Sequence, residues 1–599
     1  MHRRRLNGRT TPHSTDTVIP MHLSPSIAAI GVLACAIGAP AIAQNAGVGR
    51  GALAPGAAPP SSGALLQRNP LLNPPRNPRA REDPAIEGPA PAAAPAADAT
   101  SAPRLHVTQI VVDNAPAILA PQIAALVAPY RDRDMSLAQL RGVAVQITKL
   151  LLDHGESISY AYVPQQDIRD GVVRLRVLRG HIESIALQRN RSPVHDTVLQ
   201  SYLERGLSAS GDVRQAQSQV LRLADLPGVG AVTPVLSPAA SAGGSRLAIS
   251  VEAAPRWTGA LVADNAGSAA TGRNRLGAQL GINSPFGLGD RFQMVAYGAP
   301  RSIQSDHAGD GGNTLIGRIS YDLPIGARGA RAGLSASRVD YTTGGRYRSY
   351  GFTGFANVSG LYASYPLIRN EANTLSLGAT LDDKRMTDAY AYFGQSNARS
   401  ARVVGAELSG DRKSAFLGLP TAWQYAAGVS VGYLRNDRGW DPTGHTRGRF
   451  LKATQSARLS QSLGTDASID LALHAQQTSR TLDSSEKMTL GGPNAVRAYG
   501  IDTLSADSGY VASATINAAV PTSPGLTAQV FYDLGQATLQ KFARHERNRV
   551  RLAGYGVGLS YVFGTRATLR MSYALPRGQD ALLGKDRTPM LWANLVVRF

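Results

Sequence analysis

The sequence predicts an α+β N-terminal region followed by an antiparallel transmembrane β-barrel of about sixteen strands. From Trp257 to Phe599, segments of roughly ten residues alternate between apolar and polar side chains and are separated by Gly, Asp and Asn, as in membrane barrels. Residues 104–255 contain the order strand, helix, helix, strand, strand twice. Only 43% of the chain is hydrophobic and its one long apolar run lies near the start, which excludes a bundle of transmembrane helices.

The first 43 residues have the features of a secretory signal. Arg3–Arg5 supply positive charge, Ile27–Ala39 form an apolar core, and Ala41–Ala43 match an A-x-A cleavage site. Residues 44–103 are rich in Pro, Ala and Gly, and such a stretch buries too little apolar surface to offset its ordering entropy. We therefore predict a signal peptide over residues 1–43 and a disordered linker over residues 44–103.

Two α+β domains are expected next, over residues 104–181 and 182–255. In the first, helical spacing of apolar residues and a Ser136 cap distinguish the helices from the strands. Its expected elements are Leu105–Val112, Ala117–Tyr130, Ser136–His154, Ile158–Pro164 and Val172–Val177. Those of the second are Ile185–Gln188, Val194–Leu207, Val213–Leu223, Val232–Leu236 and Arg246–Val251.

The barrel is expected over residues 256–599. Near its end, Ala567, Leu569 and Met571 lie opposite Thr568 and Arg570, the apolar-out and polar-in alternation of a transmembrane strand. Strands of ~10 residues with short turns and longer outer loops account for the length of the region. A soluble sandwich alternates as well, but rarely through so many consecutive strands without burying both faces.

The segment Met488–Gly535 contains an arginine and an aspartate that we expect to meet. Phe531, Asp533 and Gly535 share one face of a strand, because side chains change face at every residue. A carboxylate does not comfortably face lipid, so this face must look into the barrel interior. Arg497, the one arginine of the preceding Gly-rich loop, is then the expected partner of Asp533.

These residues resemble the motifs of a known family. Val496-Arg497-Ala498-Tyr499 is similar to the VRGY loop motif, and Phe531-x-Asp533-x-Gly535 to the FxDxG strand motif, of two-partner secretion transporters of the haemolysin-activator type, in the barrel-assembly insertase superfamily. Ala498 and Ala506 stand where those motifs have Gly. The resemblance implies a 16-stranded barrel into which a loop, here about 480–508, folds back. It also implies a lock between loop and barrel, formed by Arg497, Asp533, Val496, Tyr499, Phe531 and Gly535.

The N-terminal region extends the resemblance. The repeated α+β order is similar to that of POTRA domains, the periplasmic polypeptide-binding modules of the same superfamily. Val163–Asp167 with Gly171, and Asp225–Val229, are the matching segments. The client-binding candidates are Gln165, Gln166, Asp167, Leu226 and Pro227. A sheet with a free edge can accept an extended peptide as an added strand, whereas the alternative is that the domains act only as spacers.

Further segments that resemble the family lie in the linker and at the two ends of the barrel. Ser62–Arg68 is the best candidate for the short helix that plugs the pore in some members of the family. Asp264–Gly267, Thr271–Arg273 and Pro285–Asp290 resemble the opening strands and first turn of these transporters. The alternating last strand ends at Phe599, which resembles the sorting signal read by the barrel-assembly machinery.

Composition excludes several other classes. The net charge of +20 is spread through the chain, and no zinc-finger, basic-zipper or RNA-binding signature accompanies it. The single Cys35 rules out a disulfide framework and a Cys-based zinc site. The G-x-S-x-G match at 428–432 lies inside an alternating run rather than at a strand-to-helix turn. We expect no enzymatic activity, catalytic residue, cofactor or metal.

The expected function is therefore transport of a large exoprotein, such as an adhesin or haemolysin, from the periplasm to the surface across a bacterial outer membrane. The expected partners are this client, outer-membrane lipid and the assembly machinery, with no nucleic acid and no small-molecule substrate. Two alternatives remain open at this point: an insertase for other outer-membrane barrels, and a passive porin-like barrel. Only two N-terminal repeats are found, whereas barrel-assembly relatives usually carry more.

Overall fold

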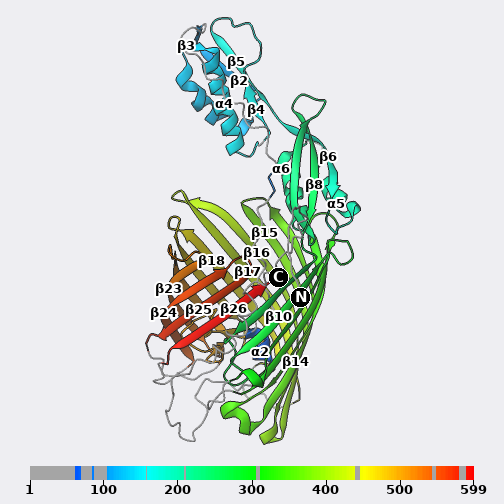
Figure 1. Cartoon of the computed structure of the whole chain (residues 1–599), viewed down its shortest axis with the longest axis vertical. Helices are drawn as coiled ribbons and strands as arrows, with labels where there is room; N and C mark the ends of the chain where they lie inside the picture. The colour runs from blue at the N-terminus through cyan, green and yellow to red at the C-terminus, as the bar shows by residue number, and fades with distance from the viewer. Residues whose placement is uncertain are drawn as a thin grey trace, which may run out of the picture. The chain divides into compact units, whose positions relative to one another are not determined.

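The computed structural model describes residues 61–68, 84–85, 104–156, 158–207, 211–304, 311–438, 446–542, 548–578 and 588–599. The predicted signal peptide lies outside the described residues, as does the predicted linker except for its two short described pieces. The described ranges contain two small α+β domains and a closed barrel (Figure 1). Among the described residues, no helix is both long and apolar enough to cross a membrane.

The first α+β domain has a three-stranded sheet of order β2-β5-β4 and a separate pair β1-β3. Its elements are β1 (Arg104–Val107), β2 (Gln109–Asp113), η1 (Ala117–Leu119), α3 (Ala120–Val127), η2 (Ala128–Tyr130), β3 (Arg133–Ser136), α4 (Leu137–Asp153), β4 (Tyr160–Tyr162) and β5 (Val172–Leu178). Helix α4 begins with a reciprocal cap, since the Ser136 hydroxyl accepts from the Gln139 N–H and the Gln139 side chain accepts from the Ser136 N–H. The expectation of one continuous strand over Leu105–Val112 was wrong, because β1 pairs with β3 and β2 with β5.

The second α+β domain has a sheet of order β6-β8-β7 covered by two helices. Its elements are β6 (His181–Asn190), α5 (Asp196–Glu204), α6 (Val213–Ala224), β7 (Val229–Pro238) and β8 (Gly244–Ala253). Tyr202 and Leu203 of α5 and Leu223 of α6 are fully buried against the sheet residues Leu247 and Ile249. This apolar layer follows from the helical spacing of those residues in the sequence.

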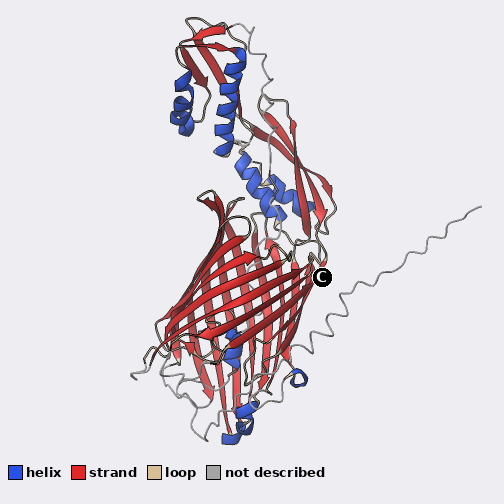
Figure 2. Cartoon of the chain, turned by 60° about the vertical axis from the view of Figure 1, so that its left-hand side comes forward, coloured by secondary structure: helices blue, strands red, loops and turns tan. Residues whose placement is uncertain are grey.

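The barrel has sixteen antiparallel strands and closes by pairing β26 with β9, as predicted. Its strands are β9 (Trp257–Asp264), β10 (Arg275–Asn283), β11 (Arg291–Ala299), β12 (Asn313–Ile325), β13 (Ala330–Thr342), β14 (Phe352–Arg369), β15 (Asn373–Tyr390), β16 (Gln395–Phe416), β17 (Leu419–Arg438), β18 (Gly448–Ser462), β19 (Ala467–Thr478), β22 (Ser508–Ala519), β23 (Leu526–Thr538), β24 (Arg549–Phe563), β25 (Ala567–Pro576) and β26 (Met590–Arg598). Three short 3₁₀ turns lie in the described parts of the barrel loops: η3 (Arg301–Ile303), η4 (Gly345–Tyr350) and η5 (Ala391–Phe393). Figure 2 shows the strands tilted around the barrel.

The strands are less uniform than expected. Strands β14 and β15 have 18 residues each, β16 has 22 and β17 has 20. A membrane crossing needs only ~10 residues, so these strands extend beyond the apolar layer instead of ending in long outer loops. The shortest seam is the closing one, where β26 pairs with β9 from Asn594–Asp264 to Arg598–Ala260.

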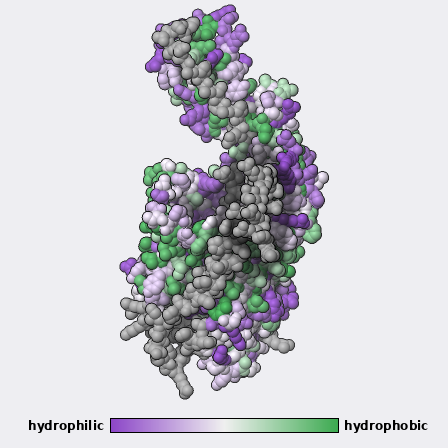
Figure 3. All heavy atoms as spheres, in the orientation of Figure 1, coloured by the Kyte–Doolittle hydropathy of each residue, from purple (hydrophilic) through white to green (hydrophobic). Residues whose placement is uncertain are grey.

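The outer surface of the barrel is apolar. On β24, Tyr555, Val557 and Leu559 are exposed, whereas Val550 and Leu552 on the opposite face are buried. Figure 3 shows hydrophobic residues gathered on the barrel wall. The exposed row therefore faces lipid and the buried row faces the lumen, which fixes the inward direction for every strand.

A short helix lies inside the barrel (Figures 1 and 2). This is α2 (Ser62–Arg68), which contacts β13, β14 and β15. Its Leu66 is buried among inward side chains that include Val339 and Met386. The Ser62 N–H donates to Asp388 Oδ1 over 2.9 Å. The segment that the sequence marked only as a candidate helix is thus helical and occupies the lumen.

Candidate functional site

The loop between β19 and β22, residues 479–507, folds back into the barrel and contains Arg497. Two short strands inside it, β20 (Met488–Thr489) and β21 (Ser505–Ala506), pair with each other. At its far end a tight turn is closed by hydrogen bonds from the Val496 N–H to Leu490 O and from the Tyr499 N–H to Val496 O. We call this segment the inward loop, and residues 496–499 its tip.

The structure brings Arg497 and Asp533 together. Arg497 Nη2 lies 2.6 Å from Asp533 Oδ1, and Arg497 Nε lies 2.8 Å from Oδ2. The Arg497 backbone N–H donates to the same Oδ2 over 3.0 Å. The Asp533 side chain is fully buried and that of Arg497 is 13% exposed. This bidentate, charge-assisted contact in a nearly dry site is stronger than an exposed ion pair.

Residues of neighbouring strands make further contacts with Arg497. Its Nη2 also donates to Ser513 Oγ and Thr515 Oγ1 on β22, over 2.8 and 3.1 Å. Its Cζ lies 3.5 Å from the centroid of the Phe531 ring, a cation–π contact. The Trp592 indole N–H donates to the Arg497 carbonyl over 2.6 Å. The tip therefore contacts β22, β23 and β26.

Small residues let the tip approach the wall. A Cβ at Gly535 would lie 3.1 Å from Val496 Cγ2, so the glycine of the strand motif leaves room for the buried valine. A Cβ at Gly554 on β24 would collide with the Ala498 methyl group. Neither Ala498 nor Ala506 adopts a positive φ. The extra methyl at 498 is accommodated by a glycine on the barrel rather than by strained loop backbone.

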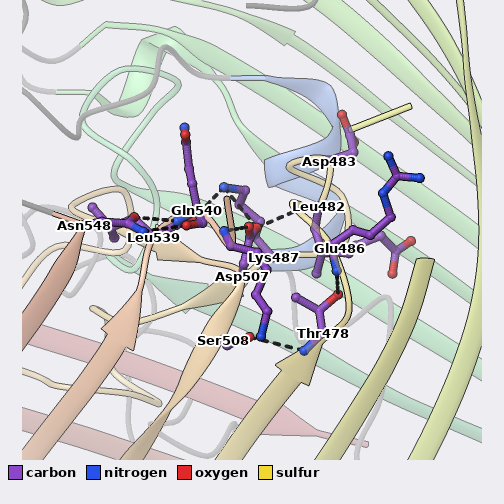
Figure 4. A network of polar contacts seen from close by, with 12 residues as sticks. Thr478, Leu482, Asp483, Glu486, Lys487, Asp507, Ser508, Leu539, Gln540 and Asn548 are labelled. Atoms are coloured by element: carbon purple, nitrogen blue, oxygen red, sulfur yellow. Dashed lines mark hydrogen bonds and ion pairs between the residues drawn. The ribbon is translucent and has the colours of Figure 1, made fainter. Parts of the chain in front are cut away.

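The two ends of the inward loop are joined by Asp507, as Figure 4 shows. This fully buried carboxylate accepts from the Leu482 N–H over 3.0 Å and from the Lys541 N–H over 2.7 Å. Lys487 Nζ lies 3.2 Å from its Oδ1 and donates to Leu539 O. Asp507 thereby ties the start and the end of the loop to the segment that follows β23.

The base of the loop carries a second set of buried charges. Glu486 accepts from Lys384 Nζ of β15 over 2.6 Å and from Lys452 Nζ of β18 over 2.5 Å. Asp483 lies 2.8 Å from Arg399 Nε of β16, and Arg399 Nη1 donates to Asp388 over 2.7 Å. We call these six residues the base network: Lys384, Asp388, Arg399, Lys452, Asp483 and Glu486. Sequence reasoning missed this network, because its members lie up to 102 positions apart and match no short motif.

Helix α2 meets the base network. Asp388 accepts from the Ser62 N–H as well as from Arg399, and Ser61 Oγ donates to Ser484 Oγ over 2.8 Å. A Cβ at Gly63 would crowd Ser484 and Ser485, so the helix packs closely on the loop. The inward loop and α2 therefore share one set of partners on the barrel wall.

The candidate client-binding residues of the α+β domains have different surroundings. Gln165 and Asp167 are exposed. The Gln166 side chain binds the Arg174 backbone in both directions, accepting over 2.8 Å and donating over 2.7 Å. Its amide therefore fixes the loop to β5.

Leu226 and Pro227 follow α6. Leu226 is 4% exposed and packs in the core of the second domain and against Gly289 of the barrel turn. Leu226 thus has a packing role in this structure, and contact of Leu226 with a client stays a prediction. Pro227 is half-buried beside it.

Two of the motifs near the ends of the barrel, those of Asn265 and Phe599, meet at the closing seam. Asn265 Nδ2 donates to Leu591 O over 2.8 Å, and the Ala593 N–H donates to Asn265 Oδ1 over 2.9 Å. Phe599 exchanges two backbone hydrogen bonds with Gly259. Asp290 accepts from the Leu288 N–H and so closes the first turn. Motif residues at both ends of the barrel thus hold its first and last strands.

Comparisons with known proteins agree with this geometry. Residues 243–561 match the family model for the haemolysin secretion/activation proteins ShlB/FhaC/HecB, and residues 105–180 match the ShlB-type POTRA domain. The chain belongs to this family. Its members are outer-membrane transporters of two-partner secretion, so this transporter secretes a partner exoprotein, with its POTRA domains in the periplasm. The predicted fold, family, function and localisation are confirmed.

Individual relatives cover most of the transporter. It is 24% identical to the haem/haemopexin transporter protein HuxB of Haemophilus influenzae strain 86-028NP, over 83% of this chain and 87% of the relative. It is 24% identical to the outer membrane transporter CdiB of Dickeya dadantii, over 63% of this chain and 65% of that one. The solved structure of CdiB from Escherichia coli matches with a TM-score of 0.63 at 20% identity, covering 84% of this chain and 92% of CdiB.

The family fixes the orientation of the inward loop. The POTRA domains precede β9, so β9 starts at the periplasmic end and successive antiparallel connections alternate between the two membrane sides. The loop after β19 then begins on the extracellular side, and the turn between β12 and β13 lies on the periplasmic side. The inward loop reaches into the barrel from outside.

Proposed function

We propose that the transporter conducts its client through the barrel in an extended form, and that contacts of the inward loop and α2 hold the resting state. The observation that carries this proposal is that Arg497, at the tip, and the base network both tie the loop to the wall, and that α2 shares the base contacts. A client that fills the lumen must displace α2, because Leu66 occupies the space between inward-facing wall residues.

The contact between Arg497 and Asp533 is proposed as the lock of the loop, with Val496, Tyr499, Phe531 and Gly535 shaping its seat. Truncating one partner of a buried ion pair strands the other charge, which costs about 3–5 kcal/mol. We propose a positioning role for this pair and no chemical step, in keeping with a transporter rather than an enzyme.

Client capture is proposed for the POTRA domains. Among the described residues, β4 pairs only with β5, so the sheet of the first domain presents an edge to which an extended peptide can add. Gln165 and Asp167 are exposed on the segment that follows this strand and remain candidates for contact with the client. Phe599 is proposed as the end of the signal for the assembly machinery.

The deciding experiment compares the proteins released by cells with the wild-type gene, without it, and with Arg497→Ala. We expect at least one large protein to be missing from the medium when the gene is deleted. With Arg497→Ala, its secretion should fall at least fivefold at equal barrel insertion, since about 1 kcal/mol corresponds to a factor of five. Arg385→Ala, an exposed residue of β15, is the matched control. Wild-type secretion by Arg497→Ala would disprove the lock.

The same strains separate the two alternatives. An insertase would lower the amounts of unrelated outer-membrane barrels when the gene is deleted. A passive porin would leave the set of secreted proteins unchanged. Cross-linking through a cysteine placed at Gln165 would then identify the client, and absence of any cross-link would remove the proposed POTRA contact.

A further inference from the structure

An open pocket of about 920 Å³ lies between the second POTRA domain and the periplasmic rim of the barrel. Arg205 and Arg222 line it from the POTRA side, and Arg328 lines it from the turn between β12 and β13. Within the described part of the chain, none of the three has a carboxylate partner in a salt bridge. Three unpaired guanidinium groups around one pocket favour an anion with several acceptor oxygens.

Two buried polar atoms in the pocket wall also lack partners. Gln219 is 7% exposed, and its Oε1 is buried without a hydrogen-bond donor among the described residues. The Arg222 Nε is likewise buried without an acceptor. Packing holds both side chains, since the Gln219 Cβ lies against Gly206 and the Arg222 stem against Gly329 of the barrel turn. Orphaned groups of this kind are costly, and a ligand that pairs with them recovers the cost.

The pKa of the Arg222 guanidinium is lowered, mainly because burial removes water from the charged form. A bound anion would offset this loss of solvation.

The pocket borders the lipid-facing side of the wall. Tyr365 lines it and belongs to the exposed row of β14 that also contains Leu361 and Leu367. Ile325, beside the pocket's barrel turn, is 52% exposed. The arginines therefore lie at the edge of the apolar band, at the level of the headgroups of the periplasmic leaflet.

We propose that this pocket binds the headgroup of one phospholipid, whose phosphate meets the arginines and whose hydrogen-bond donor meets Gln219 Oε1. The Glu204 carboxylate, which also lines the pocket, favours a headgroup that carries an ammonium group. A trimethylated choline has no N–H to donate and fits the site less well. The bound lipid bridges the second POTRA domain and the barrel rim.

The test uses the full chain in non-ionic detergent and native mass spectrometry with short-chain phosphatidylethanolamine, phosphatidylglycerol or phosphatidylcholine. We expect one molecule of phosphatidylethanolamine to be retained, and phosphatidylglycerol, which can donate to Gln219 but has no ammonium group for Glu204, to be retained more weakly. Phosphatidylcholine should bind about tenfold more weakly than phosphatidylethanolamine, the factor that corresponds to one lost hydrogen bond of about 1.4 kcal/mol. Arg205→Gln combined with Arg328→Gln should lower retention at least tenfold, and both residues are exposed, so the fold is unaffected. Arg214→Gln, an exposed arginine of α6 outside the pocket, should bind as the wild type does.

Four results would overturn the proposal. Equal retention of all three lipids by wild type and double variant would indicate ordinary boundary lipid. Inorganic phosphate bound as tightly as the lipids would indicate a site for a soluble anion. Displacement of the lipid by hexaglutamate at equimolar concentration would indicate a polypeptide surface. Gln219→Leu that preserves the preference for phosphatidylethanolamine over phosphatidylcholine would disprove the role of Gln219 Oε1.

Discussion

The inward loop is held at two places that differ in how charge is arranged. At the tip, Arg497 meets one carboxylate, Asp533, so the pair is balanced one to one. At the base, Glu486 lies between two lysines, Lys384 and Lys452. The tip contacts strands that follow the loop in sequence, whereas the base contacts strands that precede it by up to 102 residues.

The difference predicts unequal tolerance to substitution. Removal of the Arg497 side chain strands one buried charge, but the Ser513 hydroxyl group and the backbone N–H of residue 497 remain as donors to Asp533. Removal of Glu486 strands two like charges on neighbouring parts of the wall. The base should therefore be more sensitive than the tip, although only the tip carries a recognisable motif.

The largest expected effect is that of Glu486→Ala. Because Lys384 and Lys452 then repel each other without the carboxylate that bonds both of them, we expect the free energy of unfolding to fall by about 3–5 kcal/mol. Urea titration of the protein in lipid vesicles, followed by tryptophan fluorescence, measures it. Arg385→Ala, which removes an exposed ion pair next to Lys384, should cost less than about 1 kcal/mol. A smaller loss for Glu486→Ala than for Arg497→Ala would reverse the comparison.

Arg497→Ala should rank second, with a loss of about 3 kcal/mol, since Asp533 keeps one hydroxyl donor. Arg497→Lys retains the charge but loses the bidentate geometry, and we expect it to fall between wild type and Arg497→Ala. The same titration applies, together with the rate of proteolysis of the loop. If Arg497→Lys is as stable as the wild type, the positive charge alone holds the tip and the bidentate hydrogen bonds of arginine are not required.

Gly554→Ala tests the seat of the tip. Its new methyl group would overlap that of Ala498, and we expect a loss of about 1–3 kcal/mol from overpacking. The double variant with Ala498→Gly should recover most of it, because the two methyl groups compete for one space. Absence of recovery would show that Gly554 is required by its own strand and not by the tip.

The smallest expected effect is that of Phe531→Leu. The side chain remains apolar and buried, but the ring under the Arg497 guanidinium is lost, which costs about 0.5–2 kcal/mol. A double-mutant cycle with Arg497→Ala isolates this contact. A coupling energy of zero would mean that the ring only fills space.

Sequence reasoning predicted the tip because its information is local. The period-two alternation placed Asp533 on the same face as Phe531, and lipid excludes a carboxylate, so the inward direction followed from five residues. The barrel followed in the same way from repeated alternation, and the sixteen strands are present.

The base network could not be predicted in this way. Lys384 lies in the charged run Asp382–Arg385 and Lys452 lies between Leu451 and Ala453, so neither position indicates a partner. Their common partner Glu486 lies 102 and 34 residues away, and its position depends on where the loop folds back. Asp507 lies inside a segment that resembles the family. This position was the one feature of the sequence that could have indicated its role in joining the two ends of the inward loop. Ala498 stands where the motif has Gly, and the space for its methyl group is provided by Gly554 on β24. The sequence alone does not show that these two residues are in contact.

The closing seam has a mechanical consequence. Five strand-residue pairs and the two backbone hydrogen bonds between Phe599 and Gly259 join β26 to β9, whereas β16 and β17 pair along almost their whole length. If an outward force stretches the barrel evenly, the strand pair with the fewest hydrogen bonds separates first. At this pair the two side-chain hydrogen bonds of Asn265 add to the backbone bonds. Outward force from a bulky client would thus separate β26 from β9 before any other pair of neighbouring strands.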